Sequence, residues 1–150
     1  MPEAVVIRPA TPADLSGLAD LLDSPLPFEG GAVDPETQRR GLEMMLNNGR
    51  GCVLAAQCAD GTVIGLCAGQ LTISTAEGGP AVLIKDVVVR EDWRGQGIGA
   101  RLMETMGRWA KGNEAGRLHC LADLGGDCAQ DFSGHVDRRG TRLPDLHELQ

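Results

Sequence analysis

The sequence predicts one domain of the mixed α/β (α+β) class, with a mostly antiparallel sheet flanked by helices. Short apolar runs joined by turn signals fill the middle of the chain, as in antiparallel strands. A further apolar run leads into a glycine-rich turn and a segment of helical periodicity, and one more apolar run follows. The 150 residues, 42% of them hydrophobic, suit a single domain over residues 1-150 with one core.

The N-terminal third is predicted to hold a strand and two helices. Residues 5–8 form a short run rich in β-branched side chains. Thr11 supplies the N-cap of a helix, and the proline after it takes the first helical position. Leucines at helical spacing then form an apolar face of that helix. Residues 24–31 are rich in helix breakers and predict a loop. Asp34 and the proline after it start a second helix, which residues 47–49 end.

The central part of the chain is predicted to be a run of strands. Residues 52–58 and 63–73 are apolar, and the Asp-Gly pair between them is a strong hairpin signal. The remaining predicted elements are a strand at residues 82–89, a helix at residues 98–111 and a strand at residues 117–122.

A glycine-rich turn joins the strand at residues 82–89 to the helix after it. It consists of Arg94, Gly95, Gln96, Gly97, Ile98, Gly99 and Ala100. A helix begins with backbone N–H groups that lack an intrahelical partner and with the positive end of its dipole, so it attracts anions. Glycines at alternate positions remove the Cβ atoms that would hold a phosphate away from those groups. We therefore expect this turn to bind a phosphate.

The turn and its surroundings resemble the GCN5-related N-acetyltransferase (GNAT) family. Residues 94–99 match the family's acyl-CoA-binding signature, Q/R-x-x-G-x-G/A. The strand before them is similar to the family's fourth strand, and the opening IRPATPADLSGLADLL is similar to its first strand and helix. The resemblance covers residues 4–132. It implies acetyl-CoA as co-substrate, with the pyrophosphate held by residues 94–100 and the pantetheine arm paired with Val87, Val88 and Val89.

The resemblance also implies an activity. It implies an enzyme that moves an acetyl group directly from acetyl-CoA to a primary amine of a small molecule or peptide. A backbone N–H at or near Val88 is then expected to stabilise the oxyanion of the tetrahedral intermediate. In the family, residues 24–31 would line the acceptor site, so Phe28 and Glu29 are candidate substrate contacts. The alternative is a solvated loop with one anchoring aromatic side chain.

Asp86 is the first candidate for the catalytic base. An ionisable group in an apolar strand is costly unless it is paired or used. Strict alternation along the strand puts Asp86 on one face with Ile84 and Val88, and Lys85 on the other face. Only one of the two charged residues then faces the acceptor cleft. A satisfied structural carboxylate is the alternative, and Glu29 or water could serve as the base instead.

The C-terminal end departs from the family pattern. Many family members have a tyrosine there that protonates the departing thiolate, but Ser133 stands in that position and the chain contains no tyrosine. Ser133 is therefore the candidate in that role. Residues 134–150 hold only scattered apolar side chains and lack a clear closing pair of strands. We expect an atypical C-terminal end that is either poorly ordered or held by a second subunit that covers the exposed sheet edge, and we favour the homodimer.

Composition and spacing exclude several other classes of partner. A formal net charge of -7 argues against a nucleic-acid surface. The N-terminus lacks the features of a signal peptide, and no apolar run is long enough to span a membrane. Five cysteines without C-x-x-C spacing indicate buried, reduced thiols. We expect a cytoplasmic protein that has no nucleic-acid or membrane partner and no metal.

Two alternative functions remain open. A non-catalytic acyl-CoA-binding module is consistent with the missing tyrosine. A dinucleotide-binding protein is the second alternative, because Gly95, Gly97 and Ala100 also fit G-x-G-x-x-G/A. Two observations argue against a dinucleotide-binding protein. Residues 90–94 separate the glycine pattern from the strand before it, and the first half of the chain is predicted to be antiparallel.

Overall fold

The structure is a computed structural model, and it describes residues 4–22 and 34–120. Its elements are β1 (Val6–Pro9), the 3₁₀ turn η1 (Pro12–Asp14), α1 (Leu15–Leu22), α2 (Pro35–Leu46), β2 (Gly51–Gln57), β3 (Val63–Ser74), β4 (Gly79–Val89), the 3₁₀ turn η2 (Glu91–Trp93), α3 (Ile98–Gly112) and β5 (Leu118–Cys120). The predicted strands and helices are therefore present, with ends close to the predicted ones. Residues 121–150, which include the predicted atypical C-terminal end, lie outside the described residues.

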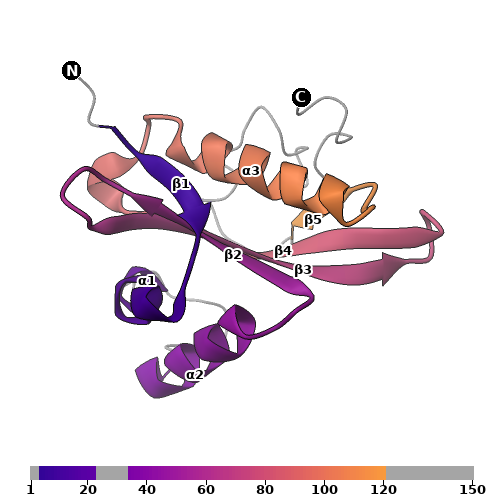
Figure 1. Ribbon diagram of the computed structural model, residues 1–150, viewed down its shortest axis with the longest axis horizontal. Helices are drawn as coiled ribbons and strands as arrows, with labels where there is room; N and C mark the ends of the chain where they lie inside the picture. The colour runs from indigo at the N-terminus through magenta and orange to yellow at the C-terminus, as the bar shows by residue number, and fades with distance from the viewer. Residues whose placement is uncertain (1–3, 23–33, 121–150) are drawn as a thin grey trace.

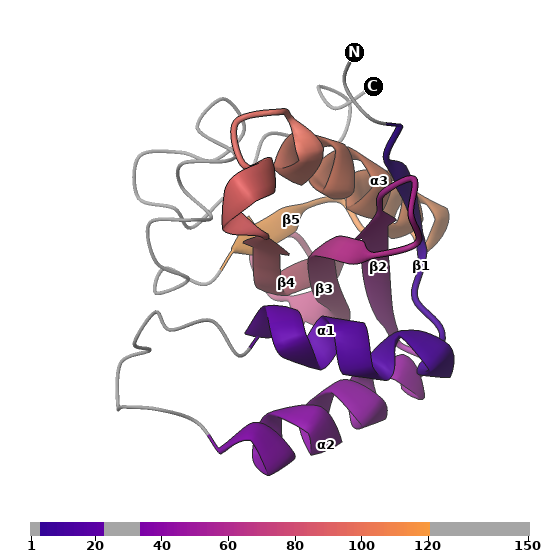
Figure 2. The ribbon, with the colours of Figure 1, turned by 90° about the vertical axis from the view of Figure 1, so that its left-hand side faces the viewer.

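The strands form one sheet in the order β1-β2-β3-β4-β5. All neighbouring pairs are antiparallel except β4 and β5, which are parallel. Helix α3 covers one face of the sheet (Figure 1), whereas α1 and α2 lie on the other (Figure 2). The mixed, mostly antiparallel sheet flanked by helices is confirmed. A dinucleotide-binding unit differs, because the strand before its glycine-rich turn has parallel neighbours on both sides.

Apolar side chains fill the space on both faces of the sheet. On the α3 side, Leu102 and Met106 are fully buried in a cluster with Ile84. On the opposite side, Leu18 of α1 and Leu66 of β3 belong to a second fully packed cluster. Burying one such side chain stabilises the fold by about 1.5–3 kcal/mol. The helices on both faces are therefore held firmly against the sheet.

Gly69 allows α3 to lie close to the sheet. A Cβ atom at this position would lie 2.9 Å from Val82 Cγ1 and 3.0 Å from Met106 Sδ. Carbon atoms pack best at roughly 3.5–4.0 Å, so any larger residue would push α3 outward. Because α3 begins directly after the glycine-rich turn, Gly69 helps to set where that turn lies.

Strand β4 contains a β-bulge at Lys85. The register pairs Ala68 with Asp86 but Gly69 with Ile84, so Lys85 has no residue opposite it in β3. The extra residue reverses the alternation, so that Ile84 packs in the α3 cluster whereas Asp86 lines a cavity beside α2. The prediction that Asp86 shares a face with Ile84 and opposes Lys85 is wrong, because strict alternation leaves no place for a bulge.

An ion pair connects β1 to the start of α1. Both terminal nitrogens of Arg8 donate to the Asp14 carboxylate at 2.8 Å, and the backbone N–H of Thr11 donates to it at 2.7 Å. The Asp14 side chain is only 9% exposed. The Arg8 guanidinium therefore lowers the pKa of Asp14 to about 2. This contact fixes the direction in which α1 leaves the sheet.

Candidate active site

The glycine-rich turn forms a small cavity at the N-terminus of α3. Gly95 and Gly97 both have φ of +80°, a left-handed conformation that favours glycine. A Cβ atom at either position would meet no protein atom within 4 Å, so both glycines face open space. The cavity has a volume of about 210 Å³ and is lined by Val89, Trp93, Arg94, Gly95, Gly97, Ile98 and Gly99.

The cavity has the properties of an anion site. The first N–H groups of α3 have no intrahelical acceptor, and the positive end of the helix dipole lies there. Arg94 belongs to the cavity wall, and its Nε donates to the carbonyl oxygen of Val89 at 3.0 Å. The predicted residues Gln96 and Ala100 do not line this cavity. The turn can therefore hold a phosphate through backbone N–H groups rather than through a cluster of side chains.

Within residues 4–22 and 34–120, the strand leading to this cavity has an edge without a partner. Pairing between β4 and β5 runs from Val82 to Ile84 and, within the described residues, goes no further. The N–H of Arg90 donates to Ile64 on β3, so antiparallel alternation also turns the N–H of Val88 toward β3. The N–H groups of Val87 and Val89 then point to the open edge. Val88, the predicted oxyanion donor, has its N–H directed away from that edge.

A larger cavity lies beside the same strand, on the face covered by α1 and α2. Its volume is about 630 Å³, and its lining comes from α1, α2, β3, β4 and the turn after α2. The lining residues are Leu22, Gln38, Gly41, Leu42, Met44, Met45, Asn48, Ala68, Gln70, Lys85 and Asp86. Burial in this apolar surrounding raises the pKa of Asp86, and the positive charge of Lys85 only partly offsets that effect.

Strand β4 contributes to both cavities, Asp86 to the larger one and Val89 to the one at the turn. Asp86 belongs to the larger cavity, and the backbone of Val87, the next residue, belongs to the open edge. Successive residues of a strand are only about 3.3 Å apart along its axis. A group held at the edge beside Val87 therefore lies within reach of a ligand beside Asp86. This geometry suits the transfer of a group from a molecule in one site to a molecule in the other.

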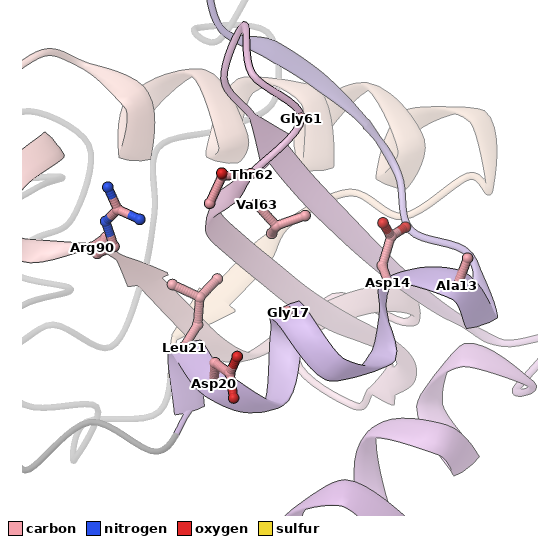
Figure 3. A pocket seen from close by; sticks show the side chains of 9 residues that line it. All are labelled: Ala13, Asp14, Gly17, Asp20, Leu21, Gly61, Thr62, Val63 and Arg90. Carbon is pink, nitrogen blue, oxygen red and sulfur yellow. The ribbon is translucent and has the colours of Figure 1, made fainter.

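A third cavity of about 400 Å³ lies between α1 and the β2–β3 turn. Figure 3 shows that Asp14 and Arg90 enter it from opposite ends. Both side chains are already bound to neighbours, Asp14 to Arg8 and Arg90 to Asp92 at 2.7 Å and 2.9 Å. Its charged groups therefore serve local structure.

Several predicted site residues lie outside the described residues. These are Phe28, Glu29 and Ser133. The prediction from sequence also missed Met44 and Met45 as site residues, although both line the larger cavity. Helical periodicity marks Met45 only as part of the apolar stripe of α2. Within residues 4–22 and 34–120, no group of His, Cys, Asp and Glu side chains is arranged to hold a metal ion. In the same ranges no helix is long and apolar enough to cross a membrane.

A family model described as the acetyltransferase (GNAT) domain matches residues 48–132. The match spans more than half of the chain, so this chain belongs to the GNAT acetyltransferase family.

Individual relatives agree with this assignment. The aminoglycoside N(6')-acetyltransferase type 1 of Stenotrophomonas maltophilia is 28% identical over 135 residues, covering 88% of this chain and 83% of the relative. The aminoglycoside N-acetyltransferase AAC(6')-Iy, solved in complex with CoA, superposes with a TM-score of 0.74 at 16% identity, over 89% of this chain and 87% of that one. A transcriptional regulator from Bacillus halodurans C-125 superposes with a TM-score of 0.72 at 23% identity, over 87% of this chain and 90% of that one. These structural matches establish a shared fold.

Proposed function

We propose that this protein transfers an acetyl group directly from acetyl-CoA to a primary amine of a small molecule or peptide. One observation carries the proposal. Asp86, a half-buried carboxylate with a raised pKa, lines a cavity one residue away from the edge of β4 that is unpaired within the described residues, and this edge leads to the glycine-rich turn. A base, an edge for a thioester and an anion site thus lie along one strand.

The cofactor is held by backbone groups in this proposal. The pyrophosphate binds the N–H groups at the start of α3, where Gly95 and Gly97 leave room for it. The pantetheine arm lies along the open edge of β4 and pairs with Val87 and Val89 as an added strand would. Acetyl-CoA then presents its thioester carbonyl beside the N–H of Val87.

The reaction follows from these positions. Asp86 accepts a proton from the acceptor's ammonium group, and the neutral nitrogen attacks the thioester carbon. The N–H of Val87 donates to the oxyanion that forms, and the carbon–sulfur bond then breaks. The products are the N-acetylated amine and CoA, whose thiolate takes up a proton. A thiolate is a fair leaving group, so transfer proceeds without the missing tyrosine, and Ser133 keeps the candidate role of proton donor.

The test uses the purified full chain, acetyl-CoA and a panel of primary amines. We expect CoA release and an acceptor that gains one acetyl group, detected by mass spectrometry of the products. Incubation with acetyl-CoA alone should leave all five cysteines unmodified in the intact mass, because transfer is direct. A protein that binds acetyl-CoA but acetylates no amine would be the non-catalytic module instead.

Aminoglycosides form a second acceptor class to include in the panel. The observation that favours them is the relative from Stenotrophomonas maltophilia, which is named for that activity. The chain's net charge of -7 is also compatible with a cationic acceptor.

A further inference from the structure

The acceptor cavity is unusual in holding two opposite charges that come from neighbouring residues. The bulge at Lys85 brings Lys85 and Asp86 to the same cavity, although a regular strand would separate them. Within the described residues, neither side chain has a hydrogen bond or an ion pair. Lys85 attracts Asp86 but only partly offsets the cost of burying that carboxylate. A ligand that carries both charges would give each of the two half-buried side chains a closer partner of opposite charge.

The rest of the described lining carries no charge. Helices α1 and α2 contribute Leu22, Leu42, Met44 and Met45, together with Gln38, and β3 contributes Ala68 and Gln70. Methionine side chains are flexible and polarisable, so they adapt to apolar groups of different shape, aromatic rings included. The cavity therefore offers one anionic contact, one cationic contact and an adaptable apolar wall.

This combination suits a small zwitterion better than an aminosugar. A polycationic aminosugar would bring several ammonium groups to a cavity whose described lining has a single carboxylate, and Lys85 would repel them. A zwitterion with an apolar body satisfies both charges and uses the apolar wall. Its ammonium group and carboxylate lie close together, as the side chains of Lys85 and Asp86 do.

We infer that the acceptor is a free α-amino acid with an apolar side chain. This inference rests on the proposed function of the same cavity. The carboxylate of the amino acid binds the Lys85 ammonium group, its amino group binds Asp86, and its side chain packs against Met44 and Met45. Asp86 takes one proton from the ammonium group, the nitrogen–carbon bond forms as the carbon–sulfur bond breaks, and the products are the N-acetyl amino acid and CoA.

The test compares L-leucine with L-leucinamide, which lacks only the carboxylate charge. We expect kcat/KM for leucine to exceed that for leucinamide at least tenfold, mainly through KM. Leucinamide has the less basic amine and is the better nucleophile at neutral pH, so amine protonation cannot produce this preference. In Lys85→Gln the ratio of the two kcat/KM values should fall to near one.

The control variant is Lys111→Gln, which removes an exposed lysine in the last turn of α3. It should keep the wild-type ratio, and CoA titrations should show that both variants retain a folded cofactor site. Equal or better use of leucinamide by the wild type, or an unchanged ratio in Lys85→Gln, would overturn the inference. Efficient acetylation of an aminoglycoside with no use of leucine would also overturn it while leaving the proposed function intact. Absence of turnover with every amine tested would refute both.

Discussion

Replacing Gly97 by valine tests whether the turn before α3 holds the pyrophosphate. A Cβ atom at Gly97 meets no protein atom within 4 Å, so valine would project into the cavity rather than into the core. The residue has φ of +80°, and a non-glycine residue in this region costs roughly 1–2 kcal/mol of stability. The substitution therefore has a conformational cost and, if the cavity holds phosphate, a separate cost in affinity.

Gly78→Val separates these two costs. Gly78 has φ of +72° and no neighbour within 4 Å of an added Cβ, but it lies in the β3–β4 turn, away from the cavity. Both variants should lose similar stability. A charge-assisted hydrogen bond contributes about 1.5–3 kcal/mol, so blocking one phosphate contact in Gly97→Val should weaken CoA binding by at least tenfold.

Calorimetric titration with CoA measures the affinity, and the fluorescence of Trp93 in the cavity wall offers a second signal. Pantetheine, which lacks the pyrophosphate, should bind the wild type and Gly97→Val equally. An unchanged CoA affinity in Gly97→Val, with the protein shown to be folded by circular dichroism, would refute the phosphate assignment.

Three further predictions concern the base, the fold and the assembly. Asp86→Asn should lower kcat by about 10²–10⁴ and remove the acid limb of the pH–rate profile, which should lie above the ordinary pKa of aspartate. It should not lower thermal stability, because it removes a half-buried charge whose pKa is raised by desolvation. An unchanged pH profile would exclude Asp86 as the base. Asp14→Asn should cost about 2 kcal/mol in urea unfolding at pH 7, since the folded-state pKa is about 2 rather than 3.8 and one unit corresponds to about 1.36 kcal/mol. That contribution is complete above the unfolded-state pKa and is lost as the pH falls toward 2, so a wild type and variant that differ equally at pH 2 and pH 7 would contradict it. We expect a homodimer, and deleting residues 135–150 should change the oligomeric state measured by light scattering. A folded deletion variant that keeps its oligomeric state would show that this segment builds no interface.

The order of the elements could be predicted because each has a local signal. Asp34 accepts from the N–H of Thr37 at 3.1 Å, so the N-cap predicted from Asp-Pro is confirmed. Helix α3 ends at Gly112, one residue beyond the end that helical periodicity predicts. Such signals depend on a few adjacent residues, and local physics determines them.

The contents of the acceptor cavity could not be predicted in the same way. No glycine or proline adjoins Lys85 in β4, so nothing in that strand's own sequence marks the bulge. A shift of one residue then decides whether Asp86 lies in the core or in a cavity. The Arg8–Asp14 pair was missed for a similar reason, since nothing in the sequence shows that a strand and the following turn fold back on each other.

In the proposed reaction, strand β4 meets its two ligands from different directions: the cofactor lies along its backbone edge, and the acceptor lies on its side-chain face. Neither ligand would then have to pass through the other's site to enter or leave. This arrangement predicts a ternary complex of the enzyme with both substrates, which can bind in either order. Double-reciprocal plots at several fixed concentrations of the second substrate should intersect, and each product should inhibit competitively against the substrate whose site it occupies.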